Sequence, residues 1–253
     1  MAVHNYLIGI GGSGAKCVES LVHLAATGAF VSQEPVHLAI IDPDLTNWNL
    51  KALKKTLADY SQTQQILAFK QQSKHRKKDE APWFGVDFVS LGQNDQSTRD
   101  FDHVVWSPND TEDTSLRLLL DRSQPTEHEQ LLFRTLFSPD ELNEKLQFGF
   151  KGHPAIGSLL LAKSFRPEIT LEESKNGHLD ENDTYWSRFC GKQSTISSIV
   201  ADGTSQVRIM VVGSIFGGTG ASGVPTVIRK LYDLYQAEIA EKRVQLGLML
   251  MLP

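Results

Sequence analysis

Apolar residues gather in four short stretches of the chain, each about the length of one strand. These stretches span residues 6–10, 37–41, 207–212 and 244–252. Their apolar runs are mostly continuous rather than alternating, which is typical of strands buried on both faces of a parallel sheet. The chain is therefore expected to contain a parallel sheet with a helix layer on each face.

Helical patterns follow three of these stretches. Apolar residues recur on one helix face over residues 17–25, 50–60 and 224–234, and we place Pro225 in the first turn of the third helix. Strands that alternate with helices predict an α/β fold. We expect a three-layer, doubly wound and mostly parallel sheet of the Rossmann type.

The middle of the chain has weaker patterns. Residues 86–91 and 103–106 have the character of short strands within a polar segment at about 70–125, which we interpret as an insertion. A second insertion is expected at about 167–200, where acidic and polar residues predominate.

Helix starts are marked between these two insertions. Thr126 with Glu129, and Ser138 with Glu141, have the spacing of a capping box, which predicts a helix at each position. A third helix is expected to begin at Pro154, because proline is favoured in the first turn of a helix.

The composition is that of an ordinary globular protein. Of 253 residues, 40% are hydrophobic and 22% are charged, and the net charge is −5. No basic stripe indicates nucleic-acid binding, and no apolar window is long enough for a membrane span. Cys17 and Cys190 are distant in the sequence and form no disulfide framework or metal motif. We therefore expect a cytoplasmic protein.

Glycine is concentrated in two windows, Gly9–Gly14 and Gly213–Gly223. Each window lies between an apolar stretch and a helical pattern. Glycine at this place exposes the backbone N–H groups of a helix N-terminus, where the helix dipole favours an anion such as phosphate. Because both windows follow strands of one parallel sheet, we expect them at the same edge of that sheet.

The first window alone has a second interpretation. It contains the dinucleotide fingerprint Gly9-x-Gly11-x-x-Gly14, and Asp42 at the end of the second strand is placed to bind a ribose. This interpretation predicts an NAD(P)-binding Rossmann oxidoreductase. It leaves the second glycine window without a function, because such an enzyme uses one window, after its first strand.

Both windows together resemble a known family. Gly217–Gly223 is similar to the signature loop G-G-G-T-G-[ST]-G of tubulin and the bacterial division protein FtsZ, with Phe216 in place of the first glycine. Gly9–Ala15 resembles the first phosphate loop of that family, Asp42–Asp44 its second and Gly152–Gly157 its third. The four loops occur in the family order, so the chain resembles the nucleotide-binding half of a divergent bacterial tubulin-like protein.

The resemblance implies that residues 1–253 form a single tubulin-like domain that binds GTP or GDP with Mg²⁺. Asp44 is the expected metal ligand. The hydroxyls of Ser13, Thr219 and Ser222 are expected to donate hydrogen bonds to phosphate oxygens. The nucleotide-binding residues that the four loops imply are Gly11, Gly12, Ser13, Gly14, Lys16, Asp42, Asp44, Gly152, Gly157, Gly217, Gly218, Thr219, Gly220, Ala221 and Ser222.

The resemblance also bears on hydrolysis. In this family, acidic residues that follow a long central helix complete the active site of the neighbouring subunit in a head-to-tail assembly. The sequence stops before such a helix, so we expect a truncation on the C-terminal side and assign no catalytic residue. GTPase activity is expected only in a longer, assembled protein, which uses the nucleotide for assembly or as a switch.

Overall fold

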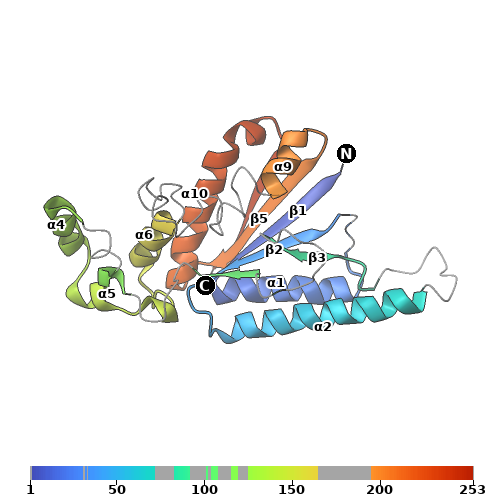
Figure 1. The fold of residues 1–253 in the computed structure, drawn as a ribbon, viewed down its shortest axis with the longest axis horizontal. Helices are drawn as coiled ribbons and strands as arrows, with labels where there is room; N and C mark the ends of the chain where they lie inside the picture. Colours follow the sequence, from blue (N-terminus) through green and yellow to red (C-terminus); the bar gives the residue numbers. More distant parts are fainter. Residues whose placement is uncertain are drawn as a thin grey trace, which may run out of the picture.

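A parallel six-stranded sheet forms the centre of the structure, which is a computed structural model (Figure 1). The structure describes residues 2–30, 32, 34–71, 83–91, 101, 104–107, 115–118, 125–164 and 195–252. The strands are β1 (Val3–Ile10), β2 (Val36–Ile41), β3 (Phe88–Ser90), β4 (Val105–Trp106), β5 (Gln206–Ser214) and β6 (Val244–Met251).

The strand order is that of a doubly wound fold. The strands lie in the order β3-β2-β1-β5-β6, and β4 continues the β3 edge by pairing with the end of β2. Ile8 of β1 pairs with Ala39 of β2 on one side and with Val211 of β5 on the other. The chain therefore winds outwards in both directions from β1, and the switch point lies between β1 and β5, where ligands of such folds bind. The expected α/β class with a mostly parallel sheet is confirmed.

Helices lie on both faces of this sheet, and Figure 1 shows α1 and α2 on one face and α9 and α10 on the other. The helical elements are α1 (Gly11–Ala26), α2 (Trp48–Gln71), α4 (Glu127–Leu136), α5 (Pro139–Asn143), the 3₁₀ turn η2 (Leu146–Phe148), α6 (Pro154–Ser164), α9 (Thr195–Asp202) and α10 (Gly218–Ala240). In the part of the chain that the structure describes, no helix combines the length and the apolar character that a membrane crossing requires.

Each helix layer has its own hydrophobic core. Leu38 and Ile40 of β2 pack with the apolar side of α1 and α2, whereas Ile8 and Ile10 of β1 pack with α9 and α10. All six residues of β2 are buried, as the continuous apolar run predicts for a strand that is covered on both faces.

The segment between residues 125 and 164 forms a third, smaller cluster beside α10. Both capping boxes are present, because Thr126 accepts from the Glu129 N–H and Ser138 accepts from the Glu141 N–H. The helix predicted at Pro154 also forms. Apolar residues that hold the cluster together include Leu116, Phe137, Leu142, Leu146, Phe150, Ile156 and Leu160.

The structure corrects the predicted start of the helix that contains Pro225. The helix begins at Gly218, so Pro225 lies inside it and not in its first turn. The glycine segment is itself the first helical turn, because tertiary contacts hold it there. A Cβ on Gly220 would lie 1.9 Å from the Ser214 carbonyl oxygen, and one on Gly218 would lie 2.8 Å from Phe150 Cβ. Similarly, α1 begins at Gly11, within the first glycine window.

Both expected insertions include elements that pack with the sheet, and the strands expected at 86–91 and 103–106 form as β3 and β4. Within 70–125, β3 and β4 complete one edge of the sheet. The second insertion cannot extend to residue 200, because Ile196 and Val200 of α9 are buried in the core under α10. Residues 165–194, with Cys190, lie outside the described residues.

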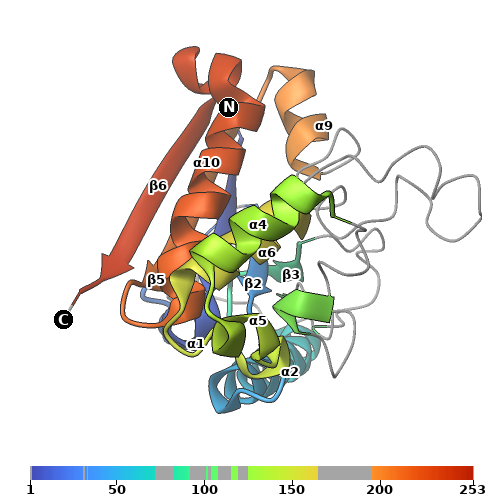
Figure 2. The same ribbon diagram turned by 90° about the vertical axis from the view of Figure 1, so that its left-hand side faces the viewer.

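Strand β6 forms the opposite edge of the sheet, and Figure 2 shows it to the left of α10. On the α1 side, β5 and β6 line an apolar groove of about 810 Å³. Met210 and Met249 in this groove are 39% and 48% exposed. Leu24 of α1, which also lines the groove, is 52% exposed. The groove is therefore an exposed apolar surface at this edge of the sheet.

Candidate functional site

Two helix N-termini meet at the switch point of the sheet. Helix α1 follows β1 directly, and α10 follows β5 after a short turn. A Cβ placed on Gly11 would lie 3.5 Å from Thr219 Cβ and 3.9 Å from the Gly220 backbone nitrogen. The first turn of α1 therefore contacts the first turn of α10, as the two glycine windows predict.

Neither helix has a side-chain cap. The N-cap positions are Ile10 for α1 and Gly217 for α10, neither makes a side-chain cap hydrogen bond, and neither first turn contains an acidic residue. The first backbone N–H groups of a helix have no partner within the helix. Two sets of such groups, with the positive ends of two helix dipoles, therefore point to one place, which favours an anion there.

Glycine at this place allows close packing as well as ligand access. Gly11 has φ +70°, a conformation that favours glycine. Gly218 and Gly220 are packed so tightly against backbone that a Cβ would clash. Gly217 is different, because a Cβ there would meet nothing within 4 Å. Gly217 therefore has open space beside it, and it lines the cavity described next.

A cavity of about 250 Å³ lies in front of the two helix N-termini. All four loops that the sequence singled out contribute to it. Ten of the fifteen predicted residues line it, namely Gly11, Gly12, Ser13, Asp42, Asp44, Gly152, Gly217, Gly218, Thr219 and Gly220.

Ser222 does not line the cavity, although its hydroxyl was expected to reach phosphate. The Ser222 side chain is fully buried, and its Oγ donates to the Gly218 carbonyl oxygen at 2.6 Å and contacts the Thr219 carbonyl oxygen at 3.2 Å. Since residues 218–222 are helical, the side chain at position 222 bonds back to the preceding turn. Ser222 therefore supports the first turn of α10 from behind.

The other four predicted residues also lie away from the cavity lining. Gly14 packs against Gly9, and Gly157 packs against Phe150. Lys16 is exposed on the outer side of α1, and Ala221 lies behind the lining residues of α10. The residues that do not line the cavity are Gly14, Lys16, Gly157, Ala221 and Ser222.

One wall of the cavity is acidic. Asp42, at the end of β2, is only 2% exposed. Its carboxylate accepts hydrogen bonds from the Asp44 N–H at 3.1 Å and from Asn47 Nδ2 at 3.2 Å. Burial, which outweighs these two hydrogen bonds, raises the pKa of Asp42 to about 7. Near neutral pH the Asp42 carboxyl is therefore partly protonated.

Asp44 is the more accessible of the two carboxylates. Its Oδ1 accepts from the Thr46 N–H at 2.9 Å and from the Thr46 hydroxyl at 2.6 Å, which fixes the side chain beside Asp42. Among the described residues, no group of three or more His, Cys, Asp or Glu side chains is placed to hold a metal ion. Two carboxylates fit Mg²⁺ only if phosphate oxygens and waters complete its shell, which is the usual way that Mg²⁺ is bound.

The segment Phe148–Gly152 forms another wall of the cavity, and most of its residues were not predicted from the sequence. It includes Lys151, which has φ +41° between two glycines that also have positive φ, Gly149 and Gly152. The Lys151 ammonium pairs with the Glu144 carboxylate. The glycines on either side of Lys151 were the signal that could have marked this turn.

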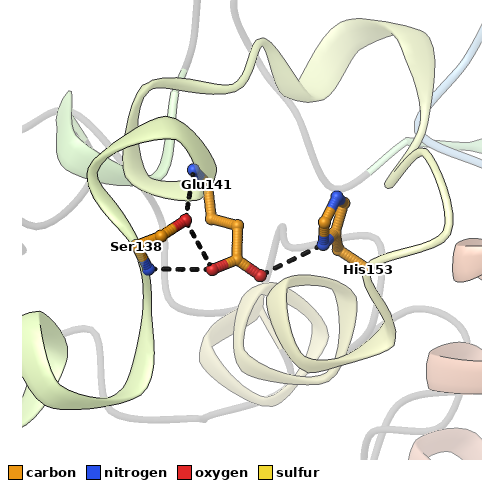
Figure 3. A network of polar contacts seen from close by, with 3 residues as sticks. All are labelled: Ser138, Glu141 and His153. Atoms are coloured by element: carbon orange, nitrogen blue, oxygen red, sulfur yellow. Dashed lines mark hydrogen bonds and ion pairs between the residues drawn. The ribbon is translucent and has the colours of Figure 1, made fainter.

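A second ion pair joins the end of this wall to α5, as Figure 3 shows. His153 Nδ1 lies 3.1 Å from Glu141 Oε1, on the carboxylate that also closes the capping box with Ser138. Hydrogen bonds from the Ser138 backbone N–H and hydroxyl hold the pKa of Glu141 below its ordinary value. His153 is itself exposed and does not line the cavity.

Asn47 is another lining residue that was not predicted from the sequence. It donates to Asp42, and its own oxygen accepts from the Asn49 N–H at 3.0 Å. The side-chain amide nitrogens of Asn47 and Asn49 lie 2.6 and 2.9 Å from where a Cβ on Gly12 would be. The turn after β2 is thereby packed against the start of α1.

Comparisons with known proteins do not extend this picture. No protein-family model matches the chain, and no curated protein or solved structure gives a significant match. The α/β fold with its parallel sheet is established by the structure itself. The likeness to tubulin and FtsZ depends on the four loop sequences alone.

Proposed function

We propose that this chain is a tubulin/FtsZ-like nucleotide-binding protein that holds the phosphates of GTP or GDP, with Mg²⁺, in the cavity between α1 and α10. The observation that carries the proposal is the meeting of two uncapped, glycine-rich helix N-termini at the switch point of the sheet. Such an arrangement supplies converging N–H donors for more than one phosphate group. The nucleotide would serve assembly or a switch.

The size of the cavity supports phosphate binding within it. A volume of about 250 Å³ is below the roughly 300–1,000 Å³ that is typical for whole ligands. The polyphosphate would occupy the cavity, and the nucleoside would extend outside it. Guanine is preferred over adenine only through the family resemblance.

The acidic wall supports a metal ion next to the phosphates. Asp42 and Asp44 offer hard oxygen ligands, and they line the same cavity as the two helix N-termini. Mg²⁺ would offset the repulsion between the negative phosphates and these two carboxylates. The residues of this chain would bind and orient the nucleotide, while the ion supplies charge neutralisation.

The NAD(P)-dependent alternative receives less support. A dinucleotide fold uses the helix N-terminus after its first strand. Here the first turn of α10 contacts that of α1 and contributes four residues to the same cavity, namely Gly217, Gly218, Thr219 and Gly220. A polyphosphate site would use both glycine windows, whereas a dinucleotide site would use only the first.

Hydrolysis by this chain is expected to be slow. Turnover needs an oriented water as well as a cradle for the phosphates. Among the described residues, the acids that line the cavity are Asp42 and Asp44, and we propose both for the metal ion. We propose that efficient hydrolysis depends on head-to-tail contact with a second subunit, so that phosphate release per subunit rises with protein concentration.

Calorimetry with GTP, GDP and NADH tests the proposal. We expect GTP and GDP to bind, EDTA to weaken their binding, and NADH not to compete. Asp44→Asn should weaken binding in Mg²⁺ and make it insensitive to EDTA. Asp59→Asn, on the exposed side of α2, is the matched control and should bind as the unchanged protein does. NADH binding without GTP or GDP binding would refute the proposal.

A further inference from the structure

Lys151 is the only lysine or arginine that lines the cavity among the residues that the structure describes. Asp42 and Asp44 line the same cavity, so its lining carries charges of both signs. Its side chain is 51% exposed, and its ammonium pairs with Glu144, which is the C-cap residue of α5. The single cation of the cavity is thus occupied by an internal carboxylate.

The backbone at Lys151 is fixed while its side chain can move. The residue has φ +41°, which costs free energy for any residue with a Cβ, and Gly149 and Gly152 turn the chain on either side. The His153–Glu141 pair and the buried Phe150 hold the same turn against α5 and α10. A lysine on such a turn is a point charge on a flexible stem, and it can change its partner without a movement of the backbone.

We propose that Lys151 exchanges Glu144 for a phosphate of the bound ligand, so that Glu144 acts as an internal competitor for the cavity's cation. This inference rests on the proposed polyphosphate site. A partly exposed ion pair such as Lys151–Glu144 contributes little stability. A phosphate held at two helix N-termini offers more negative charge in a less exposed position, so the exchange favours the ligand.

The exchange also links the ligand to the neighbouring helix. The ion pair of Glu144, the C-cap residue of α5, and the contact of Glu141, inside α5, both connect the Lys151–His153 segment to this helix. Ligand binding would break the Lys151–Glu144 ion pair and leave the His153–Glu141 contact in place. Occupancy of the cavity is thereby signalled to α5.

Opposite effects of two substitutions test the exchange. The probe is a non-hydrolysable GTP analogue with Mg²⁺, measured by calorimetry at fixed ionic strength. Lys151→Met should weaken binding roughly 10-fold or more, as expected for the loss of a charge-assisted hydrogen bond. Glu144→Gln should tighten binding about 2- to 5-fold, because the competing ion pair is removed.

The double variant and a matched lysine complete the test. Lys151→Met with Glu144→Gln should bind like Lys151→Met alone, because Glu144 competes only through Lys151. Lys242→Met is the control, since Lys242 is an exposed lysine that also has positive φ, 60°, in a turn away from the cavity. Lys151→Arg should restore most of the affinity.

The outcomes separate this inference from the function on which it rests. Absence of binding by the unchanged protein would refute both. If the unchanged protein binds the analogue but Glu144→Gln weakens binding, Glu144 is a structural support and the exchange is refuted. An affinity that Lys151→Met leaves within twofold of the unchanged protein would refute the exchange as well. Circular dichroism of each variant identifies any loss of fold.

Discussion

Replacing Asp42 with asparagine is expected to remove the part of the protein's pH-dependent stability that arises from this carboxyl. Burial raises the pKa of Asp42 from 3.8 to about 7 in the folded protein. Below pH 3.8 the carboxyl is protonated in both the folded and the unfolded states. Between 3.8 and about 7 the folded state keeps a proton that the unfolded state releases, so the free energy of unfolding falls as pH rises. Above about 7 both states are ionised and the loss has reached its full size.

The size of this loss follows from the two pKa values. Each tenfold change in an ionisation constant corresponds to about 1.4 kcal/mol, so the interval from 3.8 to about 7 corresponds to about 4 kcal/mol. Asparagine does not titrate. Its own cost, which arises because its amide would face the donating Asn47 Nδ2, is the same at every pH. The asparagine variant should therefore gain stability relative to the unchanged protein between pH 4 and pH 8.

Urea denaturation followed by circular dichroism at pH 4, 6 and 8 measures this difference. The controls are Asp59→Asn, at an exposed position on α2, and a constant ionic strength without divalent ions. We expect the difference in unfolding free energy between Asp42→Asn and the unchanged protein to change by several kcal/mol over this range. A difference that stays constant within about 0.5 kcal/mol, the size typical of neutral surface substitutions, would show that the Asp42 carboxyl is well solvated.

Two further predictions concern glycine packing and the apolar groove. Gly220→Val should destabilise the fold by about 1–3 kcal/mol or prevent folding, because its Cβ would lie 1.9 Å from the Ser214 carbonyl oxygen. Gly217→Ala has open space for its Cβ and should change the free energy of unfolding by less than about 0.5 kcal/mol. Urea denaturation compares the two, and equal stability would contradict the packing. The groove on β5 and β6 should bind the dye ANS, and Met210→Gln with Met249→Gln should reduce the fluorescence. Asp59→Asn, on the exposed side of α2 and away from the groove, is the control. Unchanged fluorescence in the double variant would place the dye elsewhere.

The framework of the site was predictable because it follows from general geometry. Continuous apolar runs indicate buried parallel strands, and parallel strands bring their carboxyl ends to one edge. The glycine windows after β1 and β5 therefore had to lie near each other. Asp42 and Asp44 follow the neighbouring strand β2 and come to the same edge for the same reason.

The details that failed depend on contacts between distant parts of the chain. Glycine is a poor helix former, so the sequence favoured a loop up to Gly223. Packing against Ser214 and Phe150 makes the segment from Gly218 helical, and this turn takes the Ser222 hydroxyl away from the cavity. Lys151 was missed because its position depends on a turn whose ion-pair partner, Glu144, is the C-cap residue of α5.

The charges around the cavity restrict the ligand more than any single motif does. Two helix N-termini and Lys151 favour an anion, whereas Asp42 and Asp44 would repel one. A free cation satisfies the carboxylates and leaves the helix amides without a partner. A complex of a metal ion with a polyphosphate satisfies both walls at once, and the proton on Asp42 is displaced when the metal ion binds. Phosphate affinity should therefore depend on Mg²⁺ more strongly than it would in a site without an acidic wall, which is why the metal-dependent part of binding is the most direct measure of the proposed function.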